Sequence, residues 1–365
     1  MAFAHSSNSG NAPSFGASDE PRGERRVART METLAIGVSG LTASRIALGT
    51  WAIGGRNWGG DSDLDESIRT IRSAVDHGIT LIDTAPVYGF GRAEEILGMA
   101  LSAGLRQRVV IATKVGLEWR GGGKVWRNSS PARIREEIEG SLRRLRTDYI
   151  DLYQVHWPDP LVPIQETAGA LARLLTEGKI RAIGVSNYSS EQMAAFREVA
   201  PIHSVQPPYN LFERGAESDV LPYAAQHGIA VLCYGALCRG LLTGTMTSAT
   251  RFIGDDLRRY DPKFQEPRYS QYLAAVTALK RYAHERYGLP VVALAVRWVL
   301  NQGDTLALWG ARHPAQLDSA KDAMGWELDD QAKRHIDEIL RQTVKDPVGP
   351  EFMAPPSRHD SALAA

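Results

Sequence analysis

The stretch LDESIRTIRSAVDHGITLIDTA, residues 64–85, holds the pattern that decides the fold. Four of its aliphatic residues recur at helical spacing, and Gly78 follows them, as a glycine often does at the end of a helix. These aliphatic residues are Leu64, Ile68, Ile71 and Val75. The next residues, ITLIDTA, form a short apolar run. The stretch therefore predicts a helix that ends at a glycine and leads into a strand buried on both faces.

The same unit recurs twice further along the chain. Residues 164–175 repeat the helical spacing, Gly178 follows them, and IRAIGVSN (180–187) has the composition of a strand. AAQHGIAVLCYGA (224–236) is a third copy, with Gly228 at the end of its helix. Repetition of helix, glycine and strand is typical of a parallel sheet with crossover helices.

About eight segments have the length and composition of strands. They are residues 45–51, 80–85, 109–114, 150–157, 180–187, 204–210, 230–236 and 305–311. Strands of this number that alternate with helices predict a closed (β/α)₈ barrel, or TIM barrel, in a single domain. A doubly wound open sheet is the alternative, but TWAIGGRNWGG after the first strand lacks the G-x-G-x-x-G spacing of that fold.

The barrel is expected to span residues 31–345. Residues 1–30 are rich in Ser, Gly, Asn and charge and lack an apolar run, which predicts a disordered N-terminal tail that ends just before Met31. Residues 346–365 are assigned to a C-terminal tail. The segment from Arg239 to Tyr269 is longer than an ordinary βα loop, and we expect it to fold over the barrel mouth.

The charge composition of the chain limits the classes of molecule that it is expected to bind. Lys plus Arg and Asp plus Glu each number 42, so no net charge attracts nucleic acid or an anionic membrane. We expect the partner to be a small molecule or a second copy of the chain, and the sequence does not indicate the oligomeric state.

Cys233 and Cys238 lie in an apolar run, which favours a reducing cytoplasm over a disulfide or metal site. Arg25 and Arg26 match an export signal only weakly, and no apolar run predicts a membrane span.

Several polar and aromatic side chains stand at the ends of the predicted strands. They are Trp51, Asp83, Lys114, His156, Trp157, Ser186, Asn187, Gln206 and Tyr234. Taken singly, each is as readily explained as a turn cap, a surface amine or core packing. In a parallel barrel, however, the C-terminal ends of all strands meet at one rim. Their joint occurrence at that rim favours an active site.

An acid, an amine, a phenol and an imidazole on one rim suit proton transfer to a carbonyl. Free tyrosine has a pKa near ~10, and Lys114 beside Asp83 is expected to lower the pKa of Tyr88. Pro86 lies between Asp83 and Tyr88, where a bend would swing the phenol back over the pocket. His156, as a neutral N–H donor, would hold the substrate oxygen and share its developing charge.

Six motifs follow one another along the chain. They are DTAPVYGFGRAEEILG, ATKVG, HWPDP, GVSN, QPPYN and YGALCRGLLTG. In these motifs and in their order, the chain resembles the aldo-keto reductase family from Leu34 to beyond residue 325. ALGTWAIGG, LWGAR and FMAPPSR further resemble the bacterial branch that includes NADP-dependent glycerol dehydrogenase and glyceraldehyde reductase. The resemblance implies a catalytic tetrad of Asp83, Tyr88, Lys114 and His156.

The resemblance also implies NADP(H) as the cofactor. Ser186, Asn187 and Gln206 would hold the nicotinamide carboxamide, and Tyr234 would stack on the nicotinamide ring. The backbone of residues 235–242 would approach the pyrophosphate, because the glycines there have no Cβ. The cofactor residues implied over this part of the chain are Thr50, Trp51, Ser186, Asn187, Gln206, Tyr234, Gly235, Leu237, Arg239, Gly240 and Leu241.

Near the end of the barrel, the resemblance assigns four more residues to the cofactor. Gly310, Ala311, Arg312 and Gln316 fall where the family holds the adenosine 2′-phosphate and the adenine. Two residues depart from the family pattern here. Trp309 stands where many relatives carry proline, and Ala320 stands where an asparagine often contacts adenine.

The resulting prediction is an NADP(H)-dependent reductase that interconverts a carbonyl and an alcohol, with Tyr88 as general acid and base. The residues expected to line a partly apolar substrate pocket are Trp51, Tyr88, Trp119, His156 and Trp157. Small polyols or glyceraldehyde are the first substrates that the branch suggests, and a bulky ketone of a xenobiotic or secondary metabolite is the second.

Two other functions remain open from the sequence. A Schiff-base aldolase would use Lys114 as its nucleophile. A non-catalytic, cofactor-sensing subunit is the other, because the fold also resembles the β subunits of voltage-gated potassium channels.

Overall fold

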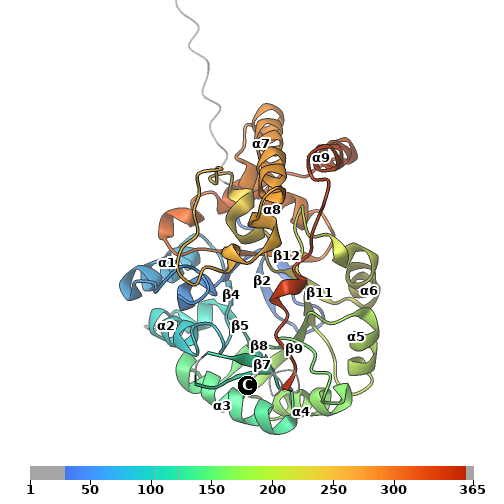
Figure 1. Ribbon diagram of the computed structural model, residues 1–365. Helices are drawn as coiled ribbons and strands as arrows, with labels where there is room; N and C mark the ends of the chain where they lie inside the picture. The colour runs from blue at the N-terminus through green and yellow to red at the C-terminus, as the bar shows by residue number, and fades with distance from the viewer. Residues whose placement is uncertain (1–28, 103, 122, 359–365) are drawn as a thin grey trace, which may run out of the picture.

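The computed structural model describes residues 29–102, 104–121 and 123–358. Eight strands form a closed barrel in which all neighbouring strands are parallel, and helices surround it (Figure 1). In the order of their pairing, the strands are β10 (Ser204–Gln206), β11 (Ala230–Cys233), β12 (Thr305–Gly310), β3 (Ile46–Gly49), β4 (Leu81–Asp83), β5 (Val110–Val115), β8 (Ile150–Val155) and β9 (Ile180–Ser186). The predicted (β/α)₈ barrel is confirmed. The predicted N-terminal tail lies outside the described residues, except for Arg29 and Thr30.

Helices cover the outside of the sheet and continue beyond the last strand. Their bounds are α1 (Leu64–Asp76), α2 (Arg92–Ala100), α3 (Pro131–Leu145), α4 (Ile164–Thr176), α5 (Ser190–Arg197), α6 (Val220–His227), α7 (Arg268–Tyr287), α8 (Val291–Leu300) and α9 (Asp330–Thr343). Side chains cap the first turns of α1, α3, α5 and α9, where they satisfy N–H groups that have no partner inside the helix. Asp63 caps α1, and Ser189 with Gln192 forms a reciprocal capping box at α5.

Short 3₁₀ helices lie in the connections. They are η1 (Ala52–Gly54), η2 (Arg106–Arg108), η3 (Gly215–Ser218), η4 (Cys238–Thr243), η5 (Leu257–Arg259), η6 (Pro262–Phe264), η7 (Pro314–Leu317), η8 (Ala320–Ala323) and η9 (Glu351–Met353). Three of them, η4 to η6, belong to the long segment before α7. Residues of that segment border the cavity at the barrel mouth.

The core has two layers because successive strand residues point to opposite faces of the sheet. Side chains such as Leu48 and Ile111 pack outward against the helices. Leu81 and Leu152 point into the barrel and pack with Ile36, from the turn between β1 (Thr33–Ala35) and β2 (Thr42–Ser44). This N-terminal hairpin therefore packs against the barrel interior.

Two features of the structure do not follow from the patterns in the sequence. One is the pair of hairpins outside the barrel, β1–β2 and a second formed by β6 (Leu117–Trp119) and β7 (Val125–Arg127). The other is the course of the chain after α9, where residues 349–358 return to the barrel mouth instead of extending from the domain (Figure 1). Both the β6–β7 hairpin and this segment border the cavity.

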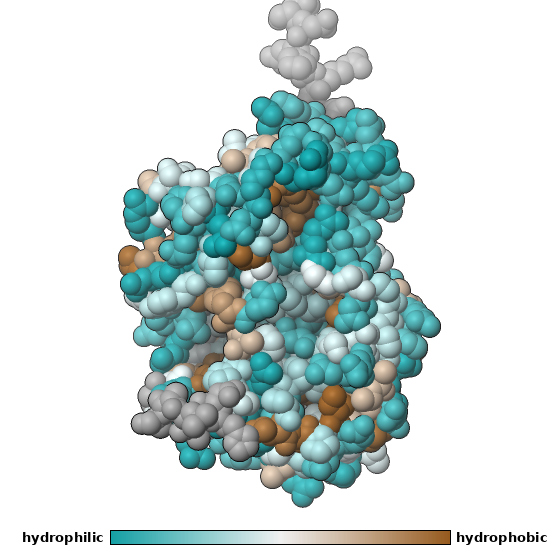
Figure 2. Space-filling view, turned by 45° about the vertical axis from the view of Figure 1, so that its right-hand side comes forward, coloured by the Kyte–Doolittle hydropathy of each residue, from teal (hydrophilic) through white to brown (hydrophobic). Residues whose placement is uncertain are grey.

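The surface is largely hydrophilic on the face in view in Figure 2, and hydrophobic side chains there form separate patches. Within the described part of the chain, no helix is both long enough and apolar enough to cross a membrane.

Candidate active site

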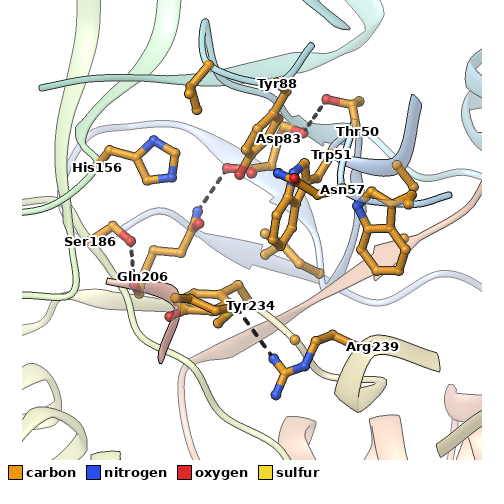
Figure 3. A pocket seen from close by; sticks show the side chains of 18 of the residues that line it. Thr50, Trp51, Asn57, Asp83, Tyr88, His156, Ser186, Gln206, Tyr234 and Arg239 are labelled. Carbon is orange, nitrogen blue, oxygen red and sulfur yellow. Dashed lines mark hydrogen bonds between the residues drawn. The ribbon is translucent and has the colours of Figure 1, made fainter. Parts of the chain in front are cut away.

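A cavity of about 560 Å³ opens at the C-terminal ends of the barrel strands. The predicted site residues that line it are Thr50, Trp51, Asp83, Tyr88, His156, Trp157, Ser186, Asn187, Gln206, Tyr234, Gly235, Leu237, Arg239, Gly240, Gly310, Ala311, Arg312 and Gln316. The structure thus brings most of the strand-end residues into one cavity. Figure 3 shows that their side chains converge from several different strands and loops.

Lys114 occupies the centre of the polar cluster beneath this cavity. Its Nζ lies 2.5 Å from Asp83 Oδ1, and it donates to Tyr88 Oη at 3.2 Å and to the Thr84 carbonyl at 3.0 Å. Asp83 ends β4 and Lys114 lies on the neighbouring strand β5, so pairing of these strands fixes the ion pair. The acid, the amine and the phenol are therefore in direct contact.

The turn after β4 returns Tyr88 to the cavity. The Tyr88 N–H donates to the Ala85 carbonyl at 3.1 Å, and Gly89 follows with a φ of +62°. A Cβ on Gly89 would overlap the Gly54 carbonyl, and a Cβ on Gly54 would lie 2.8 Å from the Tyr88 carbonyl carbon. The two glycines let η1 and the turn pack backbone to backbone. The predicted bend between Asp83 and Tyr88 is present.

Aromatic rings hold Tyr88 on both sides. The Tyr88 and His156 ring centroids are 5.9 Å apart at an interplanar angle of 83°, and Trp51 stacks on Tyr88 at 5.9 Å. Trp58 in turn meets Trp51 edge to face at 5.6 Å. Further apolar residues that line the cavity are Val87, Leu117, Val125, Trp157, Met353, Pro355 and Pro356. The phenol and the imidazole thus face a cavity with predominantly apolar walls.

Burial and the ion pair determine the protonation of Lys114 and His156. Burial by itself would lower the pKa of Lys114, but the Asp83 carboxylate and Tyr88 outweigh it and raise that pKa above its usual value. Burial, with the nearby Lys114 ammonium, holds the pKa of His156 well below its usual range. At neutral pH the site therefore contains an ammonium and an uncharged imidazole.

The direction of the Tyr88 pKa shift differs from the prediction. Burial raises the pKa of Tyr88 above its usual value, and the Lys114 ammonium opposes this effect only in part. The predicted lowering was wrong because the phenolate loses more hydration than one ion-paired ammonium replaces. Tyr88 is consequently protonated at neutral pH, which is the form that donates a proton.

The loops after β9, β10 and β11 form a polar corner of the cavity. Ser186 Oγ donates to the Gln206 carbonyl at 2.8 Å, and the Tyr234 hydroxyl donates to Asn187 Oδ1 at 2.9 Å. Asn187 Nδ2 donates to the His156 carbonyl at 3.0 Å, and Asn187 has a φ of +61°, a value that asparagine tolerates better than most residues. This corner is where the resemblance placed the carboxamide.

Arg312 and Gln316 line the cavity beyond β12. Arg312 donates to carbonyls of the loop before α1: Nη1 to Trp58 O at 3.1 Å, and Nη2 to Gly60 O at 3.4 Å and Asp61 O at 3.3 Å. Gln316 Oε1 accepts the Arg312 N–H at 2.7 Å. The guanidinium is therefore held beside the cavity by neutral acceptors, with its charge not paired to a carboxylate in these bonds.

The two departures from the family pattern have packing roles. The Trp309 indole N–H donates to the Gln316 carbonyl at 3.0 Å, and Ala320 is fully buried in η8. Neither residue lines the cavity.

Three predicted residues have different surroundings from those expected. Leu241 is buried in the outer core and does not line the cavity. Trp119 stacks on Phe90 at 5.6 Å and also does not line it. Arg239 borders the cavity, but its guanidinium is buried in ion pairs with Glu213 and Asp261, each at 2.5 Å. The Arg239 side chain therefore holds the η4 backbone in place.

Several lining residues were not found from the sequence. They are Gly49, Ala52, Asn57, Trp58, Val87, Leu117, Val125, Thr243, Arg258, Leu308, Met353, Pro355 and Pro356. The glycine run in LEWRGGGKVWR is a turn signal between two strand-like stretches and would have located the β6–β7 hairpin. The residues after 350 carry no comparable local signal, since only a tertiary contact brings them to the mouth.

Comparison with known sequences agrees with this geometry. Residues 45–341 match the Aldo/keto reductase family. Aldo-keto reductase YhdN of Bacillus subtilis (strain 168) is 58% identical over 332 residues, which cover 90% of this chain and all of that protein. The NADH-specific methylglyoxal reductase of Escherichia coli (strain K12) is 37% identical over 316 residues, 82% of this chain and 95% of that one.

Solved structures show the same fold. The glycerol dehydrogenase AKR11B4 from Gluconobacter oxydans superposes with a TM-score of 0.80 at 55% identity, over 88% of this chain and 99% of that chain. An aldo/keto reductase from Klebsiella pneumoniae, solved in complex with NADP and acetate, superposes with a TM-score of 0.66 at 30% identity, over 84% of this chain and 95% of that chain. The family expected from the motifs is confirmed: the chain belongs to the aldo-keto reductases, a family of oxidoreductases.

Proposed function

We propose that this protein is an NADP(H)-dependent reductase that interconverts an aldehyde or ketone and the corresponding alcohol, with Tyr88 as general acid and base. The observation that carries the proposal is the contact of Lys114 Nζ with both Asp83 and Tyr88, beside His156 in a cavity with apolar walls. Proton transfer to a carbonyl oxygen needs a protonated donor next to a site that excludes water.

The residues present fit a nicotinamide cofactor. Gln206 and Asn187 offer amide groups at the polar corner, and Arg312 offers a cation. Gly240 has a φ of +89°, which favours a glycine, and a glycine has no Cβ to cover the backbone there. When bound there, the nicotinamide supplies the hydride for the carbonyl carbon. Solved relatives from Klebsiella pneumoniae carry NADP or NADPH, which supports the same cofactor here.

The chain's own residues then move the proton. The uncharged His156 imidazole donates a hydrogen bond to the substrate oxygen and stabilises the negative charge that develops there. Tyr88, held protonated by its burial, donates its proton to that oxygen in reduction, and the Lys114 ammonium stabilises the phenolate that remains. Asp83 keeps Lys114 charged and in position.

The walls around Tyr88 and His156 favour substrates with an apolar substituent. Trp51, Val125, Trp157 and Met353 offer buried area but few hydrogen-bond partners for the hydroxyls of a polyol. The glycerol dehydrogenase named among the structural relatives supports a small polyol or glyceraldehyde instead. We favour the bulkier aldehyde or ketone, because unpaired hydroxyls in an apolar cavity cost binding energy.

The alternative functions have less support. Lys114 is buried and ion-paired, and its pKa is raised, so it lacks the free amine that a Schiff base requires. A sensor without turnover has no need of a proton donor in contact with a buried ammonium, and this chain keeps all four tetrad residues together. We place the enzyme in the cytoplasm, because Cys233 and Cys238 are both buried and unbridged in the described chain.

The test is a panel of aldehydes, ketones and polyols assayed with NADPH and with NADH through the absorbance of the reduced nicotinamide. We expect NADPH-dependent turnover, with a higher kcat/KM for an aromatic aldehyde than for glyceraldehyde. The reverse order would support the small polyol. Reduction with borohydride that traps a substrate on Lys114, without nicotinamide-dependent turnover, would establish the aldolase instead.

A further inference from the structure

Gln154 lies beneath the active site and has no role in the tetrad. It is fully buried on β8, where strand pairing sets it opposite Lys114 of β5 and Gly184 of β9. Its side chain points into the barrel, because the residue before it, Tyr153, packs outward in the core between sheet and helices. A polar side chain at the barrel axis requires hydrogen-bond partners there.

Gly184 makes room for this side chain. A Cβ on Gly184 would lie 2.8 Å from Gln154 Cγ and 2.5 Å from Ser204 Oγ, closer than atoms that are not bonded can approach. Gly184 does not have a positive φ, so its backbone conformation does not require a glycine. Its structural role is to leave space for the neighbouring side chains. The strand sequence thus accommodates Gln154 specifically.

Gln154 and Gln206 share one oxygen of the catalytic carboxylate. Gln154 Nε2 donates to Asp83 Oδ2 at 3.1 Å, and Gln206 Nε2 donates to the same oxygen at 2.8 Å. A carboxylate that is paired with an ammonium only accepts hydrogen bonds, so both amides must turn their nitrogen toward Asp83. This fixes the amide orientation of Gln154 and leaves its Oε1 available as an acceptor.

Gln206 donates its second N–H to that acceptor. The Gln206 Nε2 to Gln154 Oε1 distance is 3.2 Å. If Asp83 Oδ2 were the only acceptor, the Gln206 amide group could rotate about that single hydrogen bond. Because Gln154 Oε1 accepts the second N–H, the plane of the Gln206 amide is fixed. Both N–H groups of Gln206 are then engaged at the barrel axis, and none of the described residues donates to its Oε1 at the cavity wall. The cavity there presents a carbonyl acceptor (Figure 3).

We propose that Gln154 is a positioning residue that locks the Gln206 amide, so that the Gln206 carbonyl accepts the amino group of the nicotinamide carboxamide. This inference rests on the proposed cofactor. It assigns Gln154 a function in cofactor recognition, through Gln206, although Gln154 does not touch the cavity. The same two amides hold Asp83 Oδ2 while Lys114 takes Oδ1, so the carboxamide site and the proton donor share one carboxylate.

The test compares binding of NADP⁺ with binding of its 3-acetylpyridine analogue, in which a methyl group replaces the amino group of the carboxamide. Dissociation constants are measured by tryptophan fluorescence, without turnover. We expect the wild type to prefer NADP⁺, and Gln154→Met to reduce that preference by about 2- to 10-fold, the range of one neutral hydrogen bond. Methionine has nearly the length of glutamine and adapts to the same space. Gln154→Leu is the second variant, should the methionine protein not fold.

Tyr153→Phe is the matched control. Tyr153 is the neighbouring residue on β8, and its buried hydroxyl has no partner among the described residues, so its loss perturbs the strand without touching the amides. We expect this variant to keep the wild-type preference. An unchanged preference in the Gln154 variants, or an equal loss in Tyr153→Phe, would overturn the proposal, as would a wild type that does not distinguish the two nucleotides. A wild type that binds neither nucleotide would instead refute the cofactor assignment itself.

Discussion

At the scale of single residues, the site depends on the balance between burial and one ion pair. Lys114 is kept charged against its own burial by Asp83, and it is close enough to Tyr88 to stabilise the phenolate. His156 is kept uncharged by burial and by the same ammonium. Lys114 therefore acts on both groups that the proposed mechanism places at the substrate oxygen, although it does not line the cavity itself.

Replacement of Tyr88 by phenylalanine removes only the hydroxyl that we propose as the proton donor. We expect Tyr88→Phe to lower kcat by about 10²- to 10⁴-fold, the usual contribution of a general acid. The dissociation constant of NADPH, measured by fluorescence titration, should stay within about 2-fold, because the phenol hydroxyl bonds to Lys114. A variant with near-native kcat would show that another group donates the proton.

The raised pKa of Tyr88 sets the pH dependence. Reduction needs the phenol, which is present below the Tyr88 pKa and is lost as the pH rises through it; oxidation needs the phenolate, whose fraction grows as the pH approaches that pKa. We therefore expect kcat for alcohol oxidation to peak at a more alkaline pH than kcat for carbonyl reduction. Profiles should be recorded with a carbinol-deuterated alcohol for oxidation and with NADPH deuterated at the nicotinamide C4 for reduction, to confirm that hydride transfer limits the rate in each direction. Coincident profiles under that condition would contradict the role of Tyr88.

We predict that Arg312 determines the choice of nicotinamide cofactor. Its guanidinium has the geometry to pair with the 2′-phosphate of NADPH, a group that NADH lacks. We expect Arg312→Ala to weaken NADPH binding by about 10- to 100-fold and to leave NADH binding nearly unchanged. Arg251, an arginine of the long segment that does not line the cavity, is the control position. Equal weakening for both nucleotides would exclude the proposed contact, and a wild type that prefers NADH would resemble the relative from Escherichia coli in cofactor use.

The site residues that end barrel strands could be predicted from the sequence, because the topology alone gathers strand ends, whereas the cofactor residues of the loops were implied only by the family resemblance. The pKa shifts of these residues could not be predicted from the sequence. The sequence shows that Lys114 and Tyr88 are near each other, but the sign of the Tyr88 pKa shift depends on how much water the folded chain removes from the phenol. Gln154 could not be identified from the sequence for a related reason. One glutamine in an apolar strand gains a role only when Asp83 and Gln206 are brought to it from other strands.

At the scale of elements, the pocket is completed by two pieces outside the barrel strands. The Arg127 backbone N–H, at the end of β7, donates to the Pro356 carbonyl at 3.0 Å, and its Nε donates to the Pro355 carbonyl at 2.8 Å. At the other side of the segment, the buried Lys263 donates to the Gly349 carbonyl at 3.0 Å. The segment is thus fixed at both ends and places Met353 over the cavity. Local patterns predicted the barrel strands, but they could not predict a contact between residues more than 200 positions apart.

Removal of this segment should affect the substrate more than the cofactor. We expect a protein that ends at Lys345 to show a KM for aromatic aldehydes raised by about 10-fold, because Met353, Pro355 and Pro356 no longer exclude water from the pocket. The dissociation constant of NADPH should change much less. A protein that ends at Arg358 lacks only residues outside the described chain and should keep the wild-type KM. Equal KM values in the two truncated proteins would show that the segment does not bind substrate.

At the scale of the whole molecule, Glu32, near the start of the described chain, bonds to residues of the last part of the barrel. Glu32 Oε2 accepts from Arg297 Nη2 at 2.8 Å, and Glu32 Oε1 accepts the Gly325 N–H at 2.8 Å. Arg297 is almost fully buried, and its burial lowers its pKa. A buried cation without a partner lowers the stability of a fold. Glu32 therefore contributes to stability by pairing with Arg297. An isolated glutamate in the sequence gives no sign of this long-range pair, which only the folded chain brings together.

The same pair gives a prediction about the limits of the folded chain. A protein that begins at Met31 keeps Glu32 and should have the melting temperature and kcat of the full chain, since the predicted tail carries no apolar run to pack and, among the hydrogen bonds of the described residues, the truncation removes that of Arg29 to the Asp322 carbonyl. Glu32→Gln in that shorter protein removes the charge partner of Arg297. We expect it to cost about 1 to 3 kcal/mol and to lower the melting temperature by several degrees at a fixed scan rate. A large drop on truncation at Met31 would show that the tail packs against the barrel, and an unchanged melting temperature in Glu32→Gln would show that Arg297 finds another partner.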